Sequence, residues 1–539
     1  MRYIVILLVL AATVAATLFL FPQSEMKMLA LLDGVRTSAP AFMSAMANPA
    51  APNVTSVAAP LNATEALHRR LTEEGERASR AMPPSPPPAI PPNNGIVQIP
   101  IDTTKTVLNL KGQSGQPNAS VAQSVAGVSS RRRPPDTPPC FSAPGMRVAS
   151  LIKVFPEVTW HVCVEDVGVK GLWVGLVDVK LTPSSPWMRV IYQAGLADIF
   201  VPYHDNSLRW YDMRWSGWLD QVTAQDAGPN GSLITLSNET VPTVVAEVRD
   251  RGVAWLCKQT TAATRRGQEF VVWGVSDGGN YDNIVQYSFR DDGVISFRMG
   301  NTGYNDPTMP AEAHSHNALW RVDIDLNGGA NNTAYWMTHS EPDPNNSSFW
   351  NAQDFMTPFG TENARQWDYS QYSSLLIEDA ATNAFGHHIG YEFVPAELGM
   401  SRHYGVTFGA PEVWTHNDVY VTVYHDNEFG WLNGWATSNG FNFSTSSPPP
   451  GSFKWSSPDN YLLTYLTNAE PVTNADLVVW IKSSVHHEPS DEDRSSNDLN
   501  SGSPGTITGV TLAHWSGFDM MPHDLFDDNP LGGPVKCGP

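Results

Sequence analysis

From about residue 140 onward, the sequence is a succession of short runs in which apolar and polar side chains alternate. Examples are GLWVGLVDVKL, MRVIYQAGLADIFV, EFVVWGV, LWRVDIDL, DVYVTVYH and ADLVVWIKSSV. Gly, Pro, Asn and Asp residues separate the runs, and convincing amphipathic helices are scarce. A period of two places alternate side chains on opposite faces of a strand. We therefore expect residues 140–539 to form one mainly β domain, a large antiparallel β-sandwich.

The first 139 residues have a different composition. Met1 and Arg2 precede an unbroken apolar run from Tyr3 to Phe21, which is long for a signal-peptide core and close to the minimum for a membrane-spanning helix. Residues 22–139 are rich in Ala, Pro, Ser, Thr and Asn, contain no tryptophan, and include PPSPPPAIPP. We predict a signal peptide or an uncleaved signal anchor over residues 1–21 and a disordered stalk over residues 22–139.

Both interpretations of the N-terminus direct the chain into the secretory pathway. The expected location is extracellular or at the cell surface, as a single-pass type II membrane protein if the segment is retained. Nine Asn-X-Ser/Thr triplets agree with a glycoprotein, and they begin at Asn53, Asn62, Asn118, Asn230, Asn238, Asn331, Asn345, Asn346 and Asn442. Four cysteines permit two disulfides in three connectivities: Cys140, Cys163, Cys257 and Cys537. The net charge of −21 argues against a nucleic-acid partner.

A tyrosine stands at the start of a predicted hairpin, in GGNYDNIVQYSFRDDGVISFRMG over residues 278–300. The residues after Tyr281 alternate, RDDG forms the turn, and VISFRM alternates back. Taken alone, this position is typical of a half-buried strand aromatic and does not indicate chemistry.

Two histidines follow in AEAHSHNALWRVDIDLNGG. On a strand, His314 and His316 project from one face, which is how a sheet presents two nitrogen ligands to one metal. A third ligand could come from SSVHHEPSDED, which offers His486 and His487. Three neutral imidazoles suit copper or zinc, and an open fourth position leaves room for chemistry.

Two aspartates, Asp323 and Asp325, share one face of the strand that follows the histidine pair. The pattern alone favours the solvent face of an amphipathic strand. A hard-cation site is the alternative, because calcium takes carboxylate and backbone carbonyl oxygens.

The order of these motifs resembles that of the copper amine oxidases. The family's Asn-Tyr-(Asp/Glu)-(Tyr/Asn) motif matches Asn280-Tyr281-Asp282-Asn283, and its histidine pair followed by Arg-X-Asp-X-Asp matches HSHNALWRVDID. Its His-X-Pro motif matches HEPSDED, which selects His487 over His486. Its C-terminal motif matches GFDMMPHDLFDDNP. The resemblance extends in this order through residues 140–539.

This resemblance implies the oxidative deamination of primary amines to aldehydes by dioxygen, with release of ammonia and hydrogen peroxide. It implies copper(II) bound by His314, His316 and His487. It also implies that Tyr281, in the motif that begins at Asn280, is oxidised to topaquinone and forms a Schiff base with the amine. Family members are homodimers, which we expect here as well.

The segment RVIYQAGLADIFVPYHDNSLRWYDMRW resembles the family region that supplies a catalytic base. The resemblance implies Asp212 as the base and Tyr203 as the residue that positions the quinone, with Asp220 as the alternative base. Burial would raise the pKa of the base toward neutrality. A structural calcium is also implied, with ligands from Asp323, Ile324, Asp325, Asp476 and Leu477.

The chain departs from the family pattern in its N-terminal part and in two spacings. The stalk replaces the usual small α/β domains, and the intervals from Tyr203 to Asp212 and from Tyr281 to His314 are shorter than typical. Two other function classes therefore stay open. One is a catalytically silent relative that acts as an extracellular binding or adhesion module, and the other is a metal-dependent enzyme with an unmodified Tyr281.

Overall fold

The structure is a computed structural model. It describes residues 95–101, 137–203, 209–211, 218–258, 263–306, 311–340, 353–396, 413–425, 462–494 and 509–533. The expected signal segment and most of the expected stalk lie outside the described residues. All of the described residues belong to one compact unit, residues 84–539.

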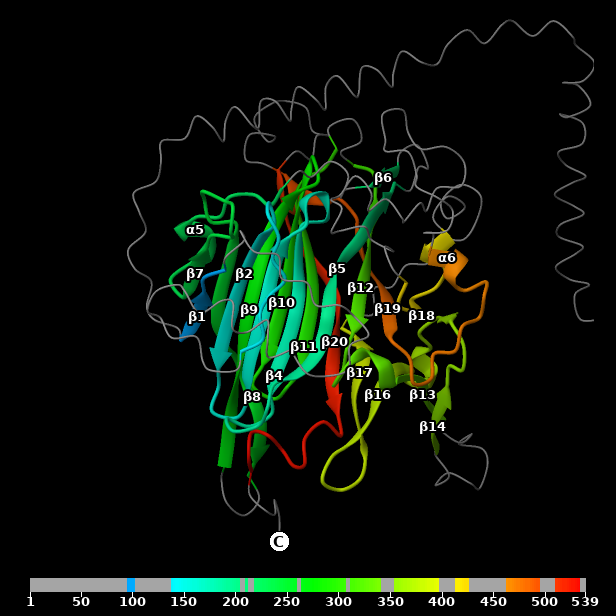
Figure 1. Ribbon diagram of the computed structural model, residues 1–539. Helices are drawn as coiled ribbons and strands as arrows, with labels where there is room; N and C mark the ends of the chain where they lie inside the picture. The colour runs from blue at the N-terminus through cyan, green and yellow to red at the C-terminus, as the bar shows by residue number, and fades with distance from the viewer. Residues whose placement is uncertain are drawn as a thin grey trace, which may run out of the picture. The chain divides into compact units, whose positions relative to one another are not determined.

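The described residues form two ten-stranded sheets, and every strand pair in them is antiparallel. In spatial order, the first sheet contains β1 (Ile96–Ile99), β2 (Arg147–Val154), β3 (Thr159–Asp166), β4 (Leu172–Lys180), β5 (Met188–Pro202), β12 (His314–Ile324), β19 (Leu477–His487), β18 (Val419–Val423) and β15 (Asn363–Arg365), with β6 (Arg209–Tyr211) paired to β5. The second contains β14 (Gln353–Pro358), β13 (Asn332–Ser340), β16 (Ser374–Thr382), β17 (His388–Pro395), β20 (Val510–His523), β11 (Ile295–Tyr304), β10 (Tyr281–Arg290), β9 (Ala263–Asp277), β8 (Val244–Cys257) and β7 (Gly231–Ile234). The expected antiparallel sandwich is confirmed (Figure 1).

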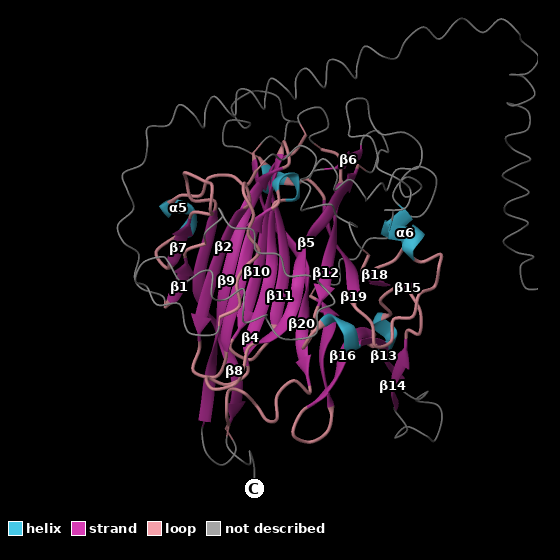
Figure 2. Cartoon of the chain, in the orientation of Figure 1, coloured by secondary structure: helices cyan, strands magenta, loops and turns pink. Residues whose placement is uncertain are grey.

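Helices are few and short in the described part of the chain (Figure 2). They are α5 (Ala224–Ala227), α6 (Leu462–Tyr465) and five 3-10 turns, η3 (Gly168–Lys170), η5 (Gly329–Asn331), η6 (Tyr369–Gln371), η7 (Val413–His416) and η10 (Asp491–Asp493). None of the helices described is long and apolar enough to cross a membrane.

The main hydrophobic core lies between the two sheets and takes side chains from both. Two of its aromatic residues bond to the opposite sheet through their polar atoms. The indole Nε1 of Trp160 on β3 donates to the carbonyl of Arg290 at 2.9 Å, and the hydroxyl of Tyr287 on β10 donates to the carbonyl of Leu172 at 2.7 Å. Each aromatic side chain therefore fills the core while its polar atom stays hydrogen-bonded, as burial requires.

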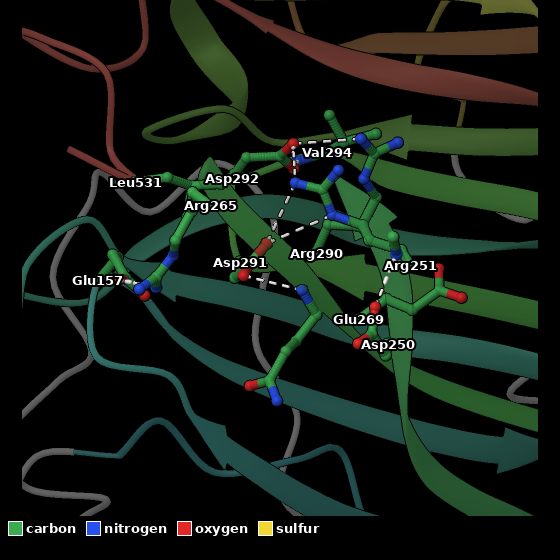
Figure 3. A network of polar contacts seen from close by, with 12 residues as sticks. Glu157, Asp250, Arg251, Arg265, Glu269, Arg290, Asp291, Asp292, Val294 and Leu531 are labelled. Carbon is green, nitrogen blue, oxygen red and sulfur yellow. Dashed lines mark hydrogen bonds and ion pairs between the residues drawn. The ribbon is translucent and has the colours of Figure 1, made fainter. Parts of the chain in front are cut away.

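Ion pairs reinforce the sandwich near the turn between β10 and β11 (Figure 3). Arg251 on β8 pairs with Asp291 at 3.2 Å and with Asp292 at 2.5 Å. Arg265 on β9 pairs with Glu157, which lies in the turn between β2 and β3 of the other sheet. Because these pairs form a partly buried network, they fix the turn more firmly than isolated surface pairs would.

The described part of the segment expected to be a disordered stalk includes a strand. Residues Ile96–Ile99 form β1, which pairs with the edge of β2 from Ile96↔Lys153 to Ile99↔Ser150. The structure therefore differs from the expectation at these residues. The sequence IVQI is apolar enough to cover an open sheet edge. So short a strand does not change the composition of the surrounding segment, and composition was the basis of the expectation.

The structure also selects one of the disulfide connectivities. Cys140 is bonded to Cys163 of β3, so the residues that precede β2 are covalently attached to the first sheet. Cys257 is disulfide-bonded as well, and Cys537 lies outside the described residues.

Candidate metal centre

The register of β12 and β19 places two of the predicted histidine ligands opposite each other. His314 pairs with His487, whereas His486 pairs with Ser315 and projects from the other face. Directly opposite residues of an antiparallel pair have Cβ atoms about 5 Å apart, so imidazoles at these positions converge. His316 projects from the same face of β12 as His314. The three predicted ligands thus gather on one face, and all are buried.

Tyr203 lies against His314. It forms an isolated β-bridge with His314 at the end of β5, and its ring stacks on the imidazole with centroids 4.5 Å apart and an angle of 18° between the planes. Because Tyr203 is itself buried, this contact restrains the orientation of the His314 ring.

Tyr281 reaches the histidines from the second sheet. Its hydroxyl oxygen lies 2.9 Å from Nδ1 of His487 and 3.1 Å from Nε2 of His314, and its ring centroid is 4.6 Å from that of His316. The hydroxyl also donates to Oδ1 of Asn305 at 3.0 Å. The phenol of β10 is therefore held among the nitrogen atoms of β12 and β19, between the two layers of the sandwich.

Two acceptors fix the protonation of the histidine rings. Nδ1 of His314 lies 3.0 Å from the carbonyl oxygen of Glu312, and Nε2 of His487 lies 3.1 Å from Oδ2 of Asp493. A carbonyl and a carboxylate accept hydrogen bonds, so these two nitrogen atoms carry the protons. The lone pairs of His314 and His487 are then on Nε2 and Nδ1, the atoms that face Tyr281.

This arrangement fits a bound copper ion. Nε2 of His314 and Nδ1 of His487 lie 3.4 Å apart, and two lone pairs at that distance are best satisfied by a cation between them. Burial and the neighbouring imidazoles hold the pKa of His316 well below its ordinary value, so its ring is neutral as well. Three neutral imidazoles with no thiolate are the donor set that copper(II) and zinc accept.

Asn280 and the returning strand hold the start of β10. The Asn280 side chain donates to the carbonyl of Tyr304 at 2.8 Å, and the amide of Tyr304 donates to the carbonyl of Asn280 at 2.9 Å. Gly303 lies opposite Tyr281 with φ of 130°. A Cβ there would overlap the Asn280 carbonyl and lie 2.8 Å from Cα of Tyr281, so only glycine permits this close approach.

Four further groups near the centre escaped the sequence reasoning. The Asn305 amide, the Glu312 carbonyl and the Asp493 carboxylate hold Tyr281 and two histidines, and the ring of His514 on β20 lies 4.6 Å from that of His487. Only Asp493 carried a local signal, because it belongs to HEPSDED. Glu312 lies two residues before His314, but a backbone carbonyl leaves no mark in a sequence motif. Asn305 and His514 approach through loop return and strand pairing, which short motifs do not encode.

Comparison with known proteins identifies the family. Residues 249–533 match the family model described as "Copper amine oxidase, enzyme domain". The chain belongs to the copper amine oxidase family. The match includes the hairpin that carries Tyr281, the histidine pair on β12 and His487 on β19.

Relatives of this copper amine oxidase family member include bacterial and plant proteins. It is 25% identical over 403 residues to a primary amine oxidase of Klebsiella aerogenes, covering 65% of this chain and 49% of the relative. It is 21% identical over 467 residues to the peroxisomal copper-containing amine oxidase alpha 2 of Arabidopsis thaliana, covering 75% and 63%. The chain thus spans about half to three-fifths of the length of these relatives.

Solved structures show the same fold. A copper-containing benzylamine oxidase from Hansenula polymorpha aligns with a TM-score of 0.51 at 17% identity, covering 70% of this chain and 62% of that one. A Pichia pastoris lysyl oxidase aligns with a TM-score of 0.52 at 17% identity, covering 70% and 53%.

Of the two candidate bases in this family member, Asp212 lies outside the described residues. Its neighbour Tyr211 ends β6 and pairs with Phe200 of β5, three residues before Tyr203. Asp220 is described and its side chain is exposed, but desolvation by the protein around it, together with Asp277, Asp282 and Asp166, raises its pKa to about 7. Asp282 follows Tyr281 on β10, so the two side chains project from opposite faces of that strand, and Asp282 is exposed. Asp220 therefore interacts with the face of β10 that points away from Tyr281.

The predicted calcium ligands also come together. Side-chain oxygens of Asp323, Asp325 and Asp476 lie within 4.8 Å of one another, and Ile324 pairs with Leu477 between β12 and β19. Arg321 donates to Oδ2 of Asp323 at 3.0 Å and offsets part of the negative charge. Carboxylates at this separation can share one hard cation.

Proposed function

We propose that this chain is a copper-dependent primary-amine oxidase that uses a topaquinone formed from Tyr281. The observation that carries the proposal is the position of the Tyr281 hydroxyl, within 3.1 Å of the unprotonated nitrogen atoms of His314 and His487. A phenol so placed is adjacent to whatever metal these imidazoles hold.

His314, His316 and His487 would hold the copper. With copper bound and the quinone formed, the chemistry supplied is the oxidation of a primary amine by dioxygen and water to an aldehyde, ammonia and hydrogen peroxide. The protein's own contribution is positioning: Asp493 and the Glu312 carbonyl orient two ligands, and Asn305 accepts the hydrogen bond of the Tyr281 hydroxyl.

Three residues keep roles that come from the family resemblance. Asp212 would act as the base that removes the proton from the carbon next to the amine nitrogen. Tyr203, stacked on His314, would restrain the ring that derives from Tyr281. Asn280 would fix the start of β10 through its bonds to Tyr304.

The deciding experiment is mass mapping of the peptide that contains Tyr281 after aerobic loading with copper. The expected result is a gain of two oxygen atoms and a loss of two hydrogen atoms, together with a coloured product on reaction with phenylhydrazine. Tyr281→Phe should abolish both signals and amine turnover while copper stays bound. Asp212→Asn should keep the colour and slow turnover by a factor on the order of a hundred or more.

An unmodified Tyr281 in the folded, copper-loaded protein would contradict the proposal. It would support the alternative of a catalytically silent relative that serves as an extracellular binding or adhesion module. Metal analysis that finds zinc at full occupancy after copper-rich expression would also reject the copper assignment.

The location and the calcium site are parts of the same proposal. We infer a secreted or cell-surface glycoprotein, and the sequon asparagines Asn230, Asn238 and Asn331 are exposed, as a glycan requires. We also infer a structural calcium held by Asp323, Asp325 and Asp476, with the carbonyls of Ile324 and Leu477.

A further inference from the structure

A second cluster of metal-ligating side chains lies on the outer face of the first sheet. Nε2 of His161 is 3.8 Å from Sγ of Cys140 and 3.7 Å from Sγ of Cys163, the two partners of the disulfide. His161 and Cys163 alternate along β3 with core residues such as Trp160, so they face away from the interior of the sandwich. All three members of the cluster are nonetheless buried.

The His161 ring is oriented by a charged neighbour. Its Nδ1 lies 3.0 Å from Oδ2 of Asp178, which also accepts a hydrogen bond from Arg189. Burial alone would raise the pKa of Asp178, but Arg189 and His161 together hold it below its ordinary value, so Asp178 is a carboxylate. Nδ1 of His161 therefore carries a proton. Nε2 faces both sulfur atoms and the hydroxyl of Ser150, which is 3.0 Å away.

The nitrogen–sulfur distances match those of a tetrahedral zinc site, whereas the two sulfur atoms, now bonded to each other, must separate to about 3.8 Å once the bond is broken. Zinc binds sulfur at about 2.3 Å and nitrogen at about 2.0 Å, which separates the two kinds of ligand atom by about 3.5 Å. The observed nitrogen–sulfur separations of 3.7 and 3.8 Å need little change. A carboxylate behind the imidazole is the usual outer partner of a zinc-bound histidine, and Asp178 supplies it. The Ser150 hydroxyl lies beside the remaining coordination position.

We propose that reduction of the Cys140–Cys163 disulfide creates a binding site for one zinc ion, with ligands from both cysteines and from His161. Breaking the sulfur–sulfur bond takes two electrons from a phosphine or dithiol reductant, with two protons from water in the first case and from the dithiol itself in the second. Zinc then replaces the two thiol protons. Two thiolates, one neutral imidazole and one divalent cation sum to zero charge, which suits a buried site.

The site would allow the residues before β2 to be linked to β3 in two ways, by the disulfide or by the metal. In the oxidised protein, the disulfide ties the residues before β2 to β3. In the reduced protein, the metal would tie the same residues. Pro144 and Gly145, which follow Cys140 closely, are exposed, so the segment after this cysteine lies at the surface of the domain.

The test uses the full-length, copper-loaded protein under anaerobic conditions. A water-soluble phosphine cleaves the disulfides, taking its oxygen atom from water and leaving two thiols per bond. Cobalt(II), a spectroscopic substitute for zinc, is then titrated in. We expect one additional cobalt per chain and sulfur-to-cobalt charge-transfer absorption, which the sulfur-free copper centre cannot give. The oxidised protein should show neither, and zinc should displace the cobalt.

Four variants locate the site. Cys163→Ser should abolish the charge-transfer band, and Asp178→Asn should weaken cobalt binding by 10- to 100-fold. His387→Ala, which alters an exposed histidine elsewhere, should change nothing, and Cys257→Ser should keep the band. Should Cys163→Ser not fold, His161→Gln replaces it, with the expected result being weaker cobalt binding.

Three outcomes would overturn the proposal. The first is the absence of the band in reduced, folded wild-type protein whose thiols have been counted. The second is a band that survives Cys163→Ser or disappears in Cys257→Ser. The third is release of the Cys140 and Cys163 thiols only under denaturing conditions.

Discussion

At the scale of single residues, the candidate copper centre depends on groups that would not themselves touch the metal. The Glu312 carbonyl and the Asp493 carboxylate decide which nitrogen of His314 and His487 would bind the metal. Such outer contacts orient a ligand and raise its basicity. We therefore expect metal affinity to respond to residues outside the ligand set.

Asp493→Ala should lower copper affinity by 10- to 100-fold, because His487 loses the acceptor that fixes its ring. Asp493→Asn keeps an acceptor oxygen and should lower copper affinity less. Competition with a copper chelator measures the effect. Asp491→Ala, in the same 3-10 turn but with an exposed side chain, serves as the control and should match the wild type. Wild-type affinity in Asp493→Ala would show that the contact does not orient the ligand.

Glu165 is a residue whose burial should make stability depend on pH. Neither of its carboxyl oxygens has a hydrogen-bond partner among the described residues, and burial raises its pKa to about 8. The folded state thus holds a proton that the unfolded state releases above its lower, ordinary pKa. The free energy of unfolding should fall by on the order of a few kcal/mol as the pH rises from about 5 to 8, and then level off.

Glu165→Gln should remove this pH dependence and raise the melting temperature at pH 8 more than at pH 5. Glu492→Gln is the matched control, because Glu492 is exposed and its lowered pKa lies outside this range. Thermal unfolding at both pH values gives the result. Parallel pH profiles for wild type and Glu165→Gln would contradict the assignment of a neutral carboxyl.

At the scale of elements, the hairpin of β10 and β11 decides where Tyr281 lies. The first strand delivers the phenol, and the return strand passes so close at Gly303 that the backbones nearly touch. The pairing of β11 with β20 shifts register between Asn301 and Gly303, where β20 has one residue more than β11, as in a β-bulge. Bulges of this kind often redirect a side chain next to a functional site.

Gly303→Ala should destabilise the fold by roughly 1–3 kcal/mol and slow the modification of Tyr281, because the new methyl group displaces the start of β10. Gly252→Ala is the matched control. Its φ is also positive, at 90°, but nothing lies within 4 Å of the added atom. Denaturant unfolding and the Tyr281 mass map measure the two effects. An equal loss of stability in both variants would mean that backbone strain, and not the clash, is the cause.

At the scale of the whole molecule, the two candidate metal centres share one strand. β12 begins at His314 and ends at Ile324, beside the carboxylate cluster. One end of this central strand would therefore carry the proposed chemistry, and the other would be secured by a structural cation. The two centres should be separable by experiment.

Removal of calcium with a calcium-selective chelator should lower the melting temperature without releasing copper, because Asp323, Asp325 and Asp476 would repel one another in the apo state. Asp476→Asn should reduce the response to the chelator. Calorimetry and metal analysis report on stability and copper separately. A melting temperature that the chelator leaves unchanged in calcium-loaded protein would reject the calcium site.

Assembly is the second property at this scale. We expect residues 140–539 to form a homodimer in solution, as family members do. Light scattering on protein without its first 83 residues, which keeps β1 paired to β2, measures the molar mass directly. A well-folded, active monomer would contradict this expectation.

The sequence by itself determined the features that depend on local periodicity. The two-residue spacing of His314 and His316 places both rings on one face of any strand, and alternation along residues 140–539 predicts a two-layer antiparallel architecture. The motif order then indicated the family, and with it His487 as the third ligand. These features can be predicted without knowledge of the fold, because each involves residues close in sequence or the order of motifs along the chain.

Only the tertiary structure decided the contacts between distant segments. The register of β12 and β19 sets His314 opposite His487, β10 brings Tyr281 from the other sheet, and Asn305 returns on the hairpin to meet it. Pairing register and layer packing depend on how the whole core is filled, which no short motif encodes. The same reason explains β1 and the Cys140–Cys163 pairing, since both join segments whose meeting only the completed sheet determines.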